Sequence, residues 1–527
     1  MKIPRLVFME ILLLALFGGF ASAWAAGGIP AVSDKVKILP ETRNGFVHPG
    51  LGLSQKNLET ARNQVLAGRE PWLSYWKEFA AGASGKHVVL QNESRSRPGE
   101  PETDAWNGRA VQSNLEHDGG LARSQALMYF FTGDEAYRRN ALHIIRVWSK
   151  MNPSKYRPYP DCQIHSPLPL HSLLQAAEII RHTSTENPDL EWKPEYTEAL
   201  ERNLIRPAIG TFMNWNGWFM NQHNFAIMGS ISGFIFLDDR KGYDQRVEWF
   251  TVNKDAPDPG RSGSIKHLAR LVTHDATTGK AVEPRVQLVE MGRDQPHSAG
   301  DLNLFAYIAN VFENQGTLVD PVSGTPSKAR NAVPVMEFLD HRILKAADYY
   351  CRYMLGYDTP WTPTPQYRTL SEADRGRWDT FDFWRIWEYY ALDKGWNLSK
   401  IAPYLDRMYR LRFRPSNWLL LPANAKGPAL RFVPFWPQND VIAIVDRSTP
   451  LDAKTKVRKE NDRRFLRVKT DPSGARIALL SCATGSRRLA MRVRTDGGAT
   501  IRFSDLTARL VLPDTRGEWR NVGFAIP

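Results

Sequence analysis

The stretch WNGWFMNQHNF, residues 215–225, brings together residue types that an ordinary helix core or loop does not combine. Amide side chains donate hydrogen bonds without carrying charge, and a histidine exchanges a proton near neutral pH. Tryptophan rings offer flat apolar faces to sugar rings, with an indole N–H at the edge. The segment therefore predicts a site that binds a sugar and moves a proton, formed by Trp215, Trp218, Asn221, Gln222, His223 and Asn224.

A second polar segment, VEMGRDQPH at residues 289–297, contains a permanent cation. The planar guanidinium of Arg293 suits a carboxylate ligand. Asp294, Gln295 and His297 follow within four residues and are candidate site residues with it. A third segment, YRPYPDCQIHSPLPLH at residues 156–171, is polar and aromatic and adds Tyr156, Tyr159 and His165.

These side chains together predict a binding site for a uronate, a sugar that carries a carboxylate. Amides and Arg293 would hold the carboxylate and make the proton on the adjacent carbon more acidic. His223 would remove that proton, and a second group would protonate the leaving oxygen, which is β-elimination. Each residue also has a structural interpretation: a histidine satisfied in the core, a local Arg293–Asp294 ion pair at a helix start, and tryptophans that fill space between helices.

Other kinds of site lack their sequence signals. His117, Asp118, His274, Asp275 and His297 are scattered without HExxH or similar metal-ligand spacing. Neither a GxSxG elbow nor a phosphate-binding loop occurs. We therefore expect no cofactor and no metal. The three cysteines allow at most one disulfide, which excludes a disulfide-stapled scaffold.

The first residues are typical of a secretory signal peptide. Lys2 and Arg5 precede an apolar run, and Ala21-Ser22-Ala23 resembles a cleavage site. The run is too short to span a membrane comfortably, so a retained anchor is the less favoured interpretation. We expect a periplasmic or secreted protein without membrane association after cleavage. Its net charge would fall from +13 to +12, because two cations and one anion are lost. A basic exported protein favours an anionic partner.

Between about residues 53 and 413 the apolar residues recur with helical spacing. Ser54 can cap a first helix, and Pro71 can open a second. A helix over 121–131, the turn Thr132-Gly133-Asp134 and a helix over 135–148 predict a helix hairpin. Further helices are predicted at 168–180, 196–213, 225–236, 302–312 and 335–354. This pattern fits a bundle, a solenoid or a closed toroid of helix hairpins.

After Pro415 the pattern changes to short alternating runs separated by turn signals. They predict a small C-terminal β-sandwich with strands at 441–445, 465–468, 475–480, 489–493, 500–503, 508–512 and 521–525. Basic residues crowd 454–469, where a solvated face is the more common explanation and a binding face the alternative.

The motifs of the helical part resemble those of the alginate-lyase superfamily of polysaccharide lyases. The resemblance covers about residues 46–412 and includes a segment FVHPG at 46–50, a hairpin ALMY…TGD…Y at 126–137, the NQHN stretch at 221–224 and, most specifically, E-x-G-R-D-Q-x-H at 290–297. It implies a mainly α protein whose catalytic domain is an (α/α) toroid. We expect a signal peptide over 1–23, an extension over 24–45, the toroid over 46–414 and the β-sandwich over 415–527.

Residue by residue, the resemblance places the catalytic base on His223, the carboxylate-binding amide on Gln222 or Asn221, and the arginine on Arg293. His297 lies in the matching motif. The family's tyrosine acid, which follows closely after the arginine, has no counterpart here. The tyrosine nearest after Arg293 is Tyr307, which on one helix would lie about 20 Å away. The proton donor stays open between a loop tyrosine, such as Tyr156 or Tyr159, and His297.

The expected function is therefore cleavage of an acidic polysaccharide, such as alginate, polymannuronate or glucuronan. Two alternatives remain. A glycoside hydrolase on the same architecture would need two opposed carboxyl groups, for which Glu290, Asp294 and Asp118 are available. A non-catalytic polysaccharide-binding protein would use the basic C-terminal part. No nucleic-acid-binding module is recognised, so nucleic acid is not an expected partner. The polymer, the endo or exo mode and the oligomeric state stay open.

Overall fold

The structure, a computed structural model, describes residues 29–85, 109–155, 161–355, 357, 359–375, 381–412 and 416–426, together with strands and adjoining residues between 449 and 525. The predicted signal peptide, Tyr156, Tyr159 and Cys482 lie outside these ranges. The described part is mainly α-helical, as predicted. None of its helices combines the length and the apolar character needed to cross a membrane.

The chain divides into two compact units, neither of which is continuous in sequence. Unit 1 contains the described parts of Met1–Leu268, Asn303–Arg342 and Ser416–Ala429, and unit 2 contains those of Ala269–Leu302, Ile343–Pro415 and Leu430–Pro527.

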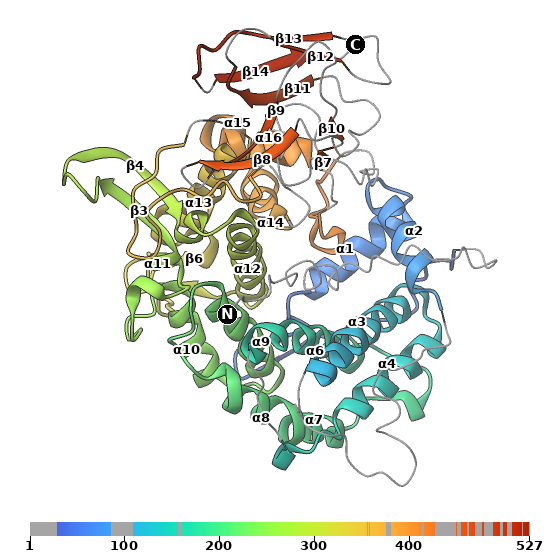
Figure 1. Cartoon of the computed structure of the whole chain (residues 1–527). Helices are drawn as coiled ribbons and strands as arrows, with labels where there is room; N and C mark the ends of the chain where they lie inside the picture. Colours follow the sequence, from blue (N-terminus) through green and yellow to red (C-terminus); the bar gives the residue numbers. More distant parts are fainter. Residues whose placement is uncertain are drawn as a thin grey trace. The chain divides into compact units, whose positions relative to one another are not determined.

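Unit 1 is built on a series of helices, each packed on its neighbours (Figure 1). Helix α3 packs against α4 and α6, α6 packs against α9, and α9 packs against α10. Its helices are α1 (Gln55–Leu66), α2 (Trp72–Ala83), α3 (Arg109–Thr132), α4 (Glu135–Trp148), α5 (Cys162–His165), α6 (Pro167–Arg181), α7 (Pro194–Leu200), α8 (Arg206–Ala208), α9 (Asn221–Phe236), α10 (Arg240–Thr251) and α11 (Ile265–Leu268). Unit 1 also contains two short antiparallel hairpins, β1 (Glu41–Arg43) with β2 (Phe46–His48) and β5 (Leu318–Val319) with β6 (Val333–Pro334).

The helix ends follow local rules that the sequence contains. Ser54 caps α1 in a reciprocal capping box with Asn57. Helix α3 stops at Gly133, whose φ of +74° favours glycine. Asp134 then accepts the Ala136 N–H at 3.0 Å and starts α4. The predicted hairpin is confirmed.

The predicted helix over 196–213 is interrupted. Two π-helical turns, η4 (Glu201–Ile205) and η5 (Ile209–Met213), flank α8. Pro207 lies inside α8, and a proline has no N–H to give to the helix ladder. The helical hydrogen-bond pattern is irregular on both sides of this residue.

Unit 2 contains a long hairpin of β3 (Ala269–His274) and β4 (Ala281–Leu288), followed by the turn η7 (Val289–Gly292). Helix α12 (Gln295–Asn314) belongs to this unit up to Leu302, and α13 (Phe338–Met354) belongs to it from Ile343. The unit's further helices are α14 (Trp384–Glu388), α15 (Leu398–Ile401) and α16 (Pro403–Leu411).

The C-terminal strands form antiparallel pairs. They are β7 (Thr449–Pro450) with β10 (Ile477–Ala478), β8 (Thr455–Glu460) with β9 (Arg463–Val468), β11 (Arg488–Val493) with β14 (Arg520–Ala525), and β12 (Ala499–Arg502) with β13 (Arg509–Leu512). Six of the predicted strands coincide with these elements, and the predicted strand at 441–445 lies outside the described residues. The basic run 454–469 includes the β8–β9 hairpin.

Candidate functional site

The predicted histidine base, His223, lies at the start of α9 in unit 1 and is buried there. His223 is 1% exposed, and its Nε2 lies 3.0 Å from the carbonyl oxygen of Trp249. A carbonyl only accepts, so Nε2 carries the proton and donates. Nδ1 is then a bare lone pair, and this buried atom has no hydrogen-bond partner among the described residues. Burial, with a smaller effect from Arg246, lowers the pKa of His223 to about 4, so the ring is neutral at pH 7.

The amides beside His223 differ in what they can reach. Asn221 and Asn224 are buried. Asn224 donates through Nδ2 to the Gly263 carbonyl at 2.9 Å, which ties the start of α9 to a neighbouring loop. Gln222 is half-buried and accepts a hydrogen bond from Gln163 at 3.3 Å. Of the three amides, Gln222 is therefore the one placed to meet a ligand.

The two tryptophans form an edge-to-face pair. Their ring centroids are 4.7 Å apart at an interplanar angle of 82°, and Trp215 is 49% exposed. The Trp215 ring lies on Gly217, where a Cβ atom would meet it at 2.6 Å. An exposed ring supported from below is a geometry on which a sugar can stack. His165 is half-buried at the end of α5 in the same unit.

Arg246 is a buried cation beside His223 that the sequence analysis missed. It is 1% exposed and stacks 4.0 Å over the Trp249 ring. Its hydrogen bonds go to the neutral side chains of Ser230, Gln245 and Asn214. Burial lowers its pKa to about 10. Its position in α10 did not indicate burial, because an arginine in a helix is ordinarily a surface residue.

Unit 1 also contains a small cavity of about 30 Å³ with a mixed polar and apolar lining, which includes Arg123, His171 and Tyr307. Arg123 donates to Gln175 at 2.7 Å, and His171 Nδ1 lies 2.8 Å from the hydroxyl of Ser232. Burial and the Arg123 cation lower the pKa of His171 to about 3. The volume suits about two water molecules and is too small for a sugar ring. Tyr307, the tyrosine nearest after Arg293 in the sequence, lines this cavity.

Unit 2 holds the second predicted cluster at the corner between η7 and α12. Arg293 donates through Nη1 to Glu290 Oε1 at 2.9 Å, and its Nε lies 3.7 Å from Asp294. Its side chain is 36% exposed, whereas Glu290 is fully buried. The described residues accept no further hydrogen bond from this guanidinium. One side of Arg293 is therefore fixed, and the remaining N–H groups are available to a ligand.

Asp294 and His297 form a hydrogen-bonded pair in the first turn of α12. His297 Nδ1 lies 2.7 Å from both carboxylate oxygens of Asp294, and Asp294 Oδ1 also accepts the His297 backbone N–H at 2.9 Å. Burial raises the pKa of Asp294, but the His297 and Arg293 contacts outweigh it and hold that pKa below its usual value. With Nδ1–H donating to Asp294, the lone pair of His297 is on Nε2. Asp294 thus holds His297 in place, and its role in substrate binding stays a prediction.

Gln295 is a correction to the predicted substrate-binding set. The side chain is fully buried and donates to the carbonyl oxygens of Met291 at 3.2 Å and Ser371 at 2.7 Å. Both amide hydrogens are used to fasten the segment around Ser371 to α12. A sugar has no access to this group.

Tyr367 is the phenol beside Arg293 that the sequence analysis missed. A Cβ atom on Gly292 would lie 2.3 Å from Tyr367 Cβ and 2.8 Å from its Cγ, so the tyrosine rests directly on the Gly292 backbone. Burial and then the Glu290 carboxylate raise the pKa of Tyr367 to about 12, partly opposed by Arg293. Its hydroxyl therefore keeps its proton at neutral pH. The glycine at position 292 was the only feature of the sequence that could have indicated this contact, since a residue without a Cβ permits the close approach of the Tyr367 side chain.

The other tyrosines of this region are occupied. Tyr349, Tyr350 and Tyr353 donate to the backbone carbonyls of Pro360, Gln295 and Ser371, respectively. Tyr367 makes no side-chain hydrogen bond to the described residues. It is therefore the tyrosine near Arg293 whose hydroxyl is available to form a hydrogen bond with a substrate.

Comparison with known proteins does not extend these observations: no protein-family model matches the chain, and no curated protein is significantly similar to it.

Proposed function

We propose that the protein is an exported polysaccharide lyase that cleaves a uronate polymer by β-elimination. The observation that carries the proposal is the cluster in unit 2. Arg293 supplies a partly exposed cation, Asp294 fixes the lone pair of His297 on Nε2, and Tyr367 supplies a protonated phenol. Carboxylate binding, proton removal and proton donation are the requirements of this reaction.

Each group has one step. Arg293 binds the carboxylate at C5 and stabilises the negative charge that develops there. His297 Nε2 takes the C5 proton, and the electron pair of that bond forms the C4=C5 double bond. The bond from C4 to the glycosidic oxygen breaks, and the Tyr367 hydroxyl gives its proton to that oxygen.

The resemblance assigns the base to His223, whereas burial favours His297. The lone pair of His223 is on a buried atom, and a sugar C–H must contact the base that removes its proton. His297 is partly exposed and is oriented by a carboxylate, an arrangement that recurs in general-base catalysis. His223 is proposed to hold the start of α9 in place.

The carboxyl groups considered for a hydrolase do not favour that alternative. Glu290 and Asp118 are fully buried, and Asp118 accepts hydrogen bonds from Trp148 at 3.0 Å and His117 at 2.9 Å. Burial and the adjacent Glu290 carboxylate raise the pKa of the buried Asp301. A glycosidase needs two carboxyl groups that face the sugar about 5–9.5 Å apart. Asp294, which is partly exposed, is already paired with His297.

The test is ultraviolet absorbance during incubation with polymannuronate, polyguluronate, glucuronan and hyaluronan, each offered separately. Elimination creates a double bond conjugated to the carboxylate, and hydrolysis does not. A rising signal on one polymer identifies the lyase reaction and its substrate. New reducing ends without absorbance would instead establish a hydrolase and reject the proposal.

Two variants then test the roles. Arg293→Lys keeps the charge but loses the planar fork, so we expect weaker substrate binding and a lower kcat. Tyr367→Phe removes the proton donor and should lower kcat by about 10²-fold or more. Tyr196→Phe, at a half-buried tyrosine of unit 1, is the matched control and should turn over normally. Normal turnover by Tyr367→Phe would exclude this phenol as the acid.

A further inference from the structure

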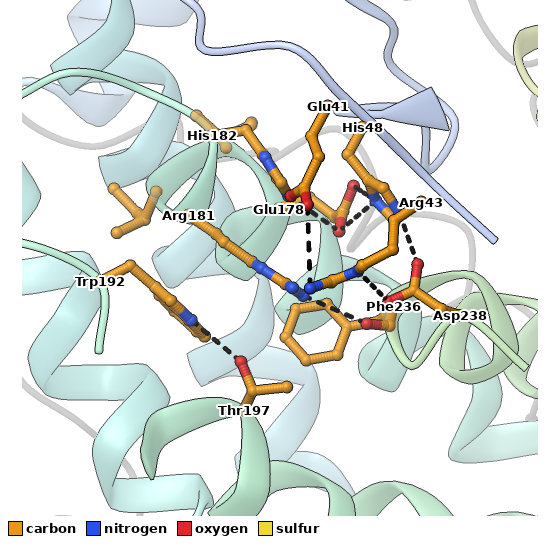
Figure 2. A network of polar contacts seen from close by, with 12 residues as sticks. Glu41, Arg43, His48, Glu178, Arg181, His182, Trp192, Thr197, Phe236 and Asp238 are labelled. Atoms are coloured by element: carbon orange, nitrogen blue, oxygen red, sulfur yellow. Dashed lines mark hydrogen bonds and ion pairs between the residues drawn. The ribbon is translucent and has the colours of Figure 1, made fainter. Parts of the chain in front are cut away.

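A second cluster of titratable side chains lies in unit 1 and takes no part in the proposed lyase chemistry (Figure 2). His48 ends β2, Glu178 and His182 lie one turn apart at the end of α6, and Asp238 follows α9. His48 Nδ1 lies 3.1 Å from both oxygens of Glu178, and His48 Nε2 lies 2.9 Å from Asp238 Oδ1. His48, Glu178 and His182 are all at least 97% buried.

His182 is the member of this cluster that has an unsatisfied ring nitrogen. Its ring stacks on that of His48, with centroids 5.1 Å apart and planes within 16°. Its Nε2 lies 3.9 Å from Glu178 Oε1, beyond hydrogen-bond distance, and this buried atom has no hydrogen-bond partner among the described residues. A buried polar atom left unpaired costs about 1–3 kcal/mol, so such an atom points to a missing ligand.

The opposite nitrogens of both rings are held as they are in metal sites. A metal-binding histidine commonly donates its other N–H to a carboxylate or a backbone carbonyl. His48 Nε2 faces Asp238, which is itself held by Arg43 Nε at 2.6 Å. The His182 ring has a hydrogen-bond partner in the Leu39 backbone. These contacts leave His48 Nδ1 and His182 Nε2 on the side of the Glu178 carboxylate.

The spacing of the three donor atoms fits one small ion. They all lie within 4.8 Å of one another. Ligand atoms about 2.1 Å from a tetrahedral zinc ion are about 3.4 Å apart. Glu178 lies 3.1 Å from His48 Nδ1 and 3.9 Å from His182 Nε2, and these two distances bracket that value. A small movement of the His182 ring toward Glu178 would therefore complete the site.

We propose that His48 Nδ1, Glu178 and His182 Nε2 bind a divalent transition-metal ion of the zinc class. Two imidazoles and one carboxylate suit zinc or cobalt, whereas magnesium and calcium prefer oxygen ligands. A water molecule would fill the fourth position. Because the ligands come from β2 and α6, the ion would fasten the N-terminal segment to the helical core of unit 1 and act in stability.

A proton is the alternative occupant of the same position. Burial lowers the pKa of His48, but Asp238 and Glu178 together raise it to about 10. In the absence of an ion, His48 Nδ1–H therefore donates to Glu178. A metal ion has to displace this proton, and direct binding measurements separate the two possibilities.

The experiment uses the untagged exported protein, stripped with a chelator and titrated calorimetrically with Zn²⁺ and, separately, Mg²⁺. We expect one zinc per chain, a rise in Tm with zinc, and no effect of magnesium. The variant His182→Phe keeps a ring stacked on His48 but removes the ligand nitrogen, so its Kd for zinc should weaken at least 100-fold. His274→Phe, at an exposed position of β3, is the matched control and should bind zinc normally.

Absence of zinc binding by the wild-type protein would overturn the proposal, and so would equal affinity in His182→Phe. If His182→Phe does not fold, Asp238→Asn decides. Loss of the carboxylate that orients His48 should weaken zinc binding 10–100-fold, and an unchanged Kd would reject the site. Substitution of Co²⁺ adds a visible spectrum whose intensity reports four-coordinate geometry. None of these measurements depends on lyase activity.

Discussion

Replacement of Asp294 by asparagine tests whether the carboxylate positions His297 for proton transfer. Asparagine has almost the same shape, and it caps helices as well as aspartate does. Its side-chain oxygen can still accept the His297 backbone N–H, which Asp294 accepts at 2.9 Å. The substitution therefore removes the charge from the 2.7 Å contact with His297 Nδ1 while preserving the start of α12.

The expected size of the effect follows from that one contact. A hydrogen bond to a charged group contributes about 1.5–3 kcal/mol. Both side chains are about four-fifths buried, so solvent screens the contact only in part. If about 2–3 kcal/mol of this interaction is realised in the transition state, where His297 becomes positively charged, kcat falls about 30–150-fold. The free energy of unfolding at pH 7 should change much less.

The assay combines initial rates from ultraviolet absorbance with urea unfolding and nitrogen NMR of the histidine rings. We expect a reduced kcat, a nearly unchanged KM, and a His297 ring that no longer favours the Nδ1–H tautomer. Asp294→Ala is the comparison, because it loses the helix cap as well and should be less stable by about 1 kcal/mol. Wild-type kcat in a folded Asp294→Asn protein, on a polymer that the enzyme cleaves, would refute the positioning role.

Three further predictions concern the same region and the charge of the chain. Gly292→Ala should lower kcat and destabilise the fold by about 1–3 kcal/mol, because the new methyl group would lie 2.3 Å from Tyr367 Cβ; the matched change Gly82→Ala, in α2 with nothing within 4 Å of the new methyl group, should leave kcat unchanged. The depressed pKa of Asp294 stabilises the folded state above the unfolded pKa of about 4, and this contribution is lost as pH falls through the folded pKa. Urea unfolding at pH 7 and pH 3 should therefore show a stability difference between wild type and Asp294→Asn that shrinks in acid, and a constant difference would contradict it. Substrate affinity should weaken as salt is raised, because the positive net charge, +13 for the full chain and +12 after the expected cleavage, attracts an acidic polymer, and salt-independent binding would exclude this attraction.

Much of the secondary structure could be predicted from the sequence because its causes are local. The Ser54 cap and the turn at Gly133 and Asp134 depend on atoms within four residues of one another. Six of the C-terminal strands were predictable for the same reason, since alternation and turn residues act over a few positions, whereas β7 and β8 were not predicted. The interruption at Pro207 also has a local cause, which the helical periodicity over 196–213 concealed.

The sequence by itself also singled out the candidate motif around Arg293 and His297, where Asp294 and His297 are one helical turn apart. Only the tertiary structure decided the surroundings of each predicted residue. Tyr367 reaches Gly292 from a distant segment, His223 is buried at the start of α9, and Gln295 is enclosed by the segment around Ser371. The same holds for His48, which meets Glu178 and His182 only when β2 packs on α6. A residue's type and spacing fix what its side chain can do, but exposure, pKa and partners are set by packing between segments that are far apart in the chain.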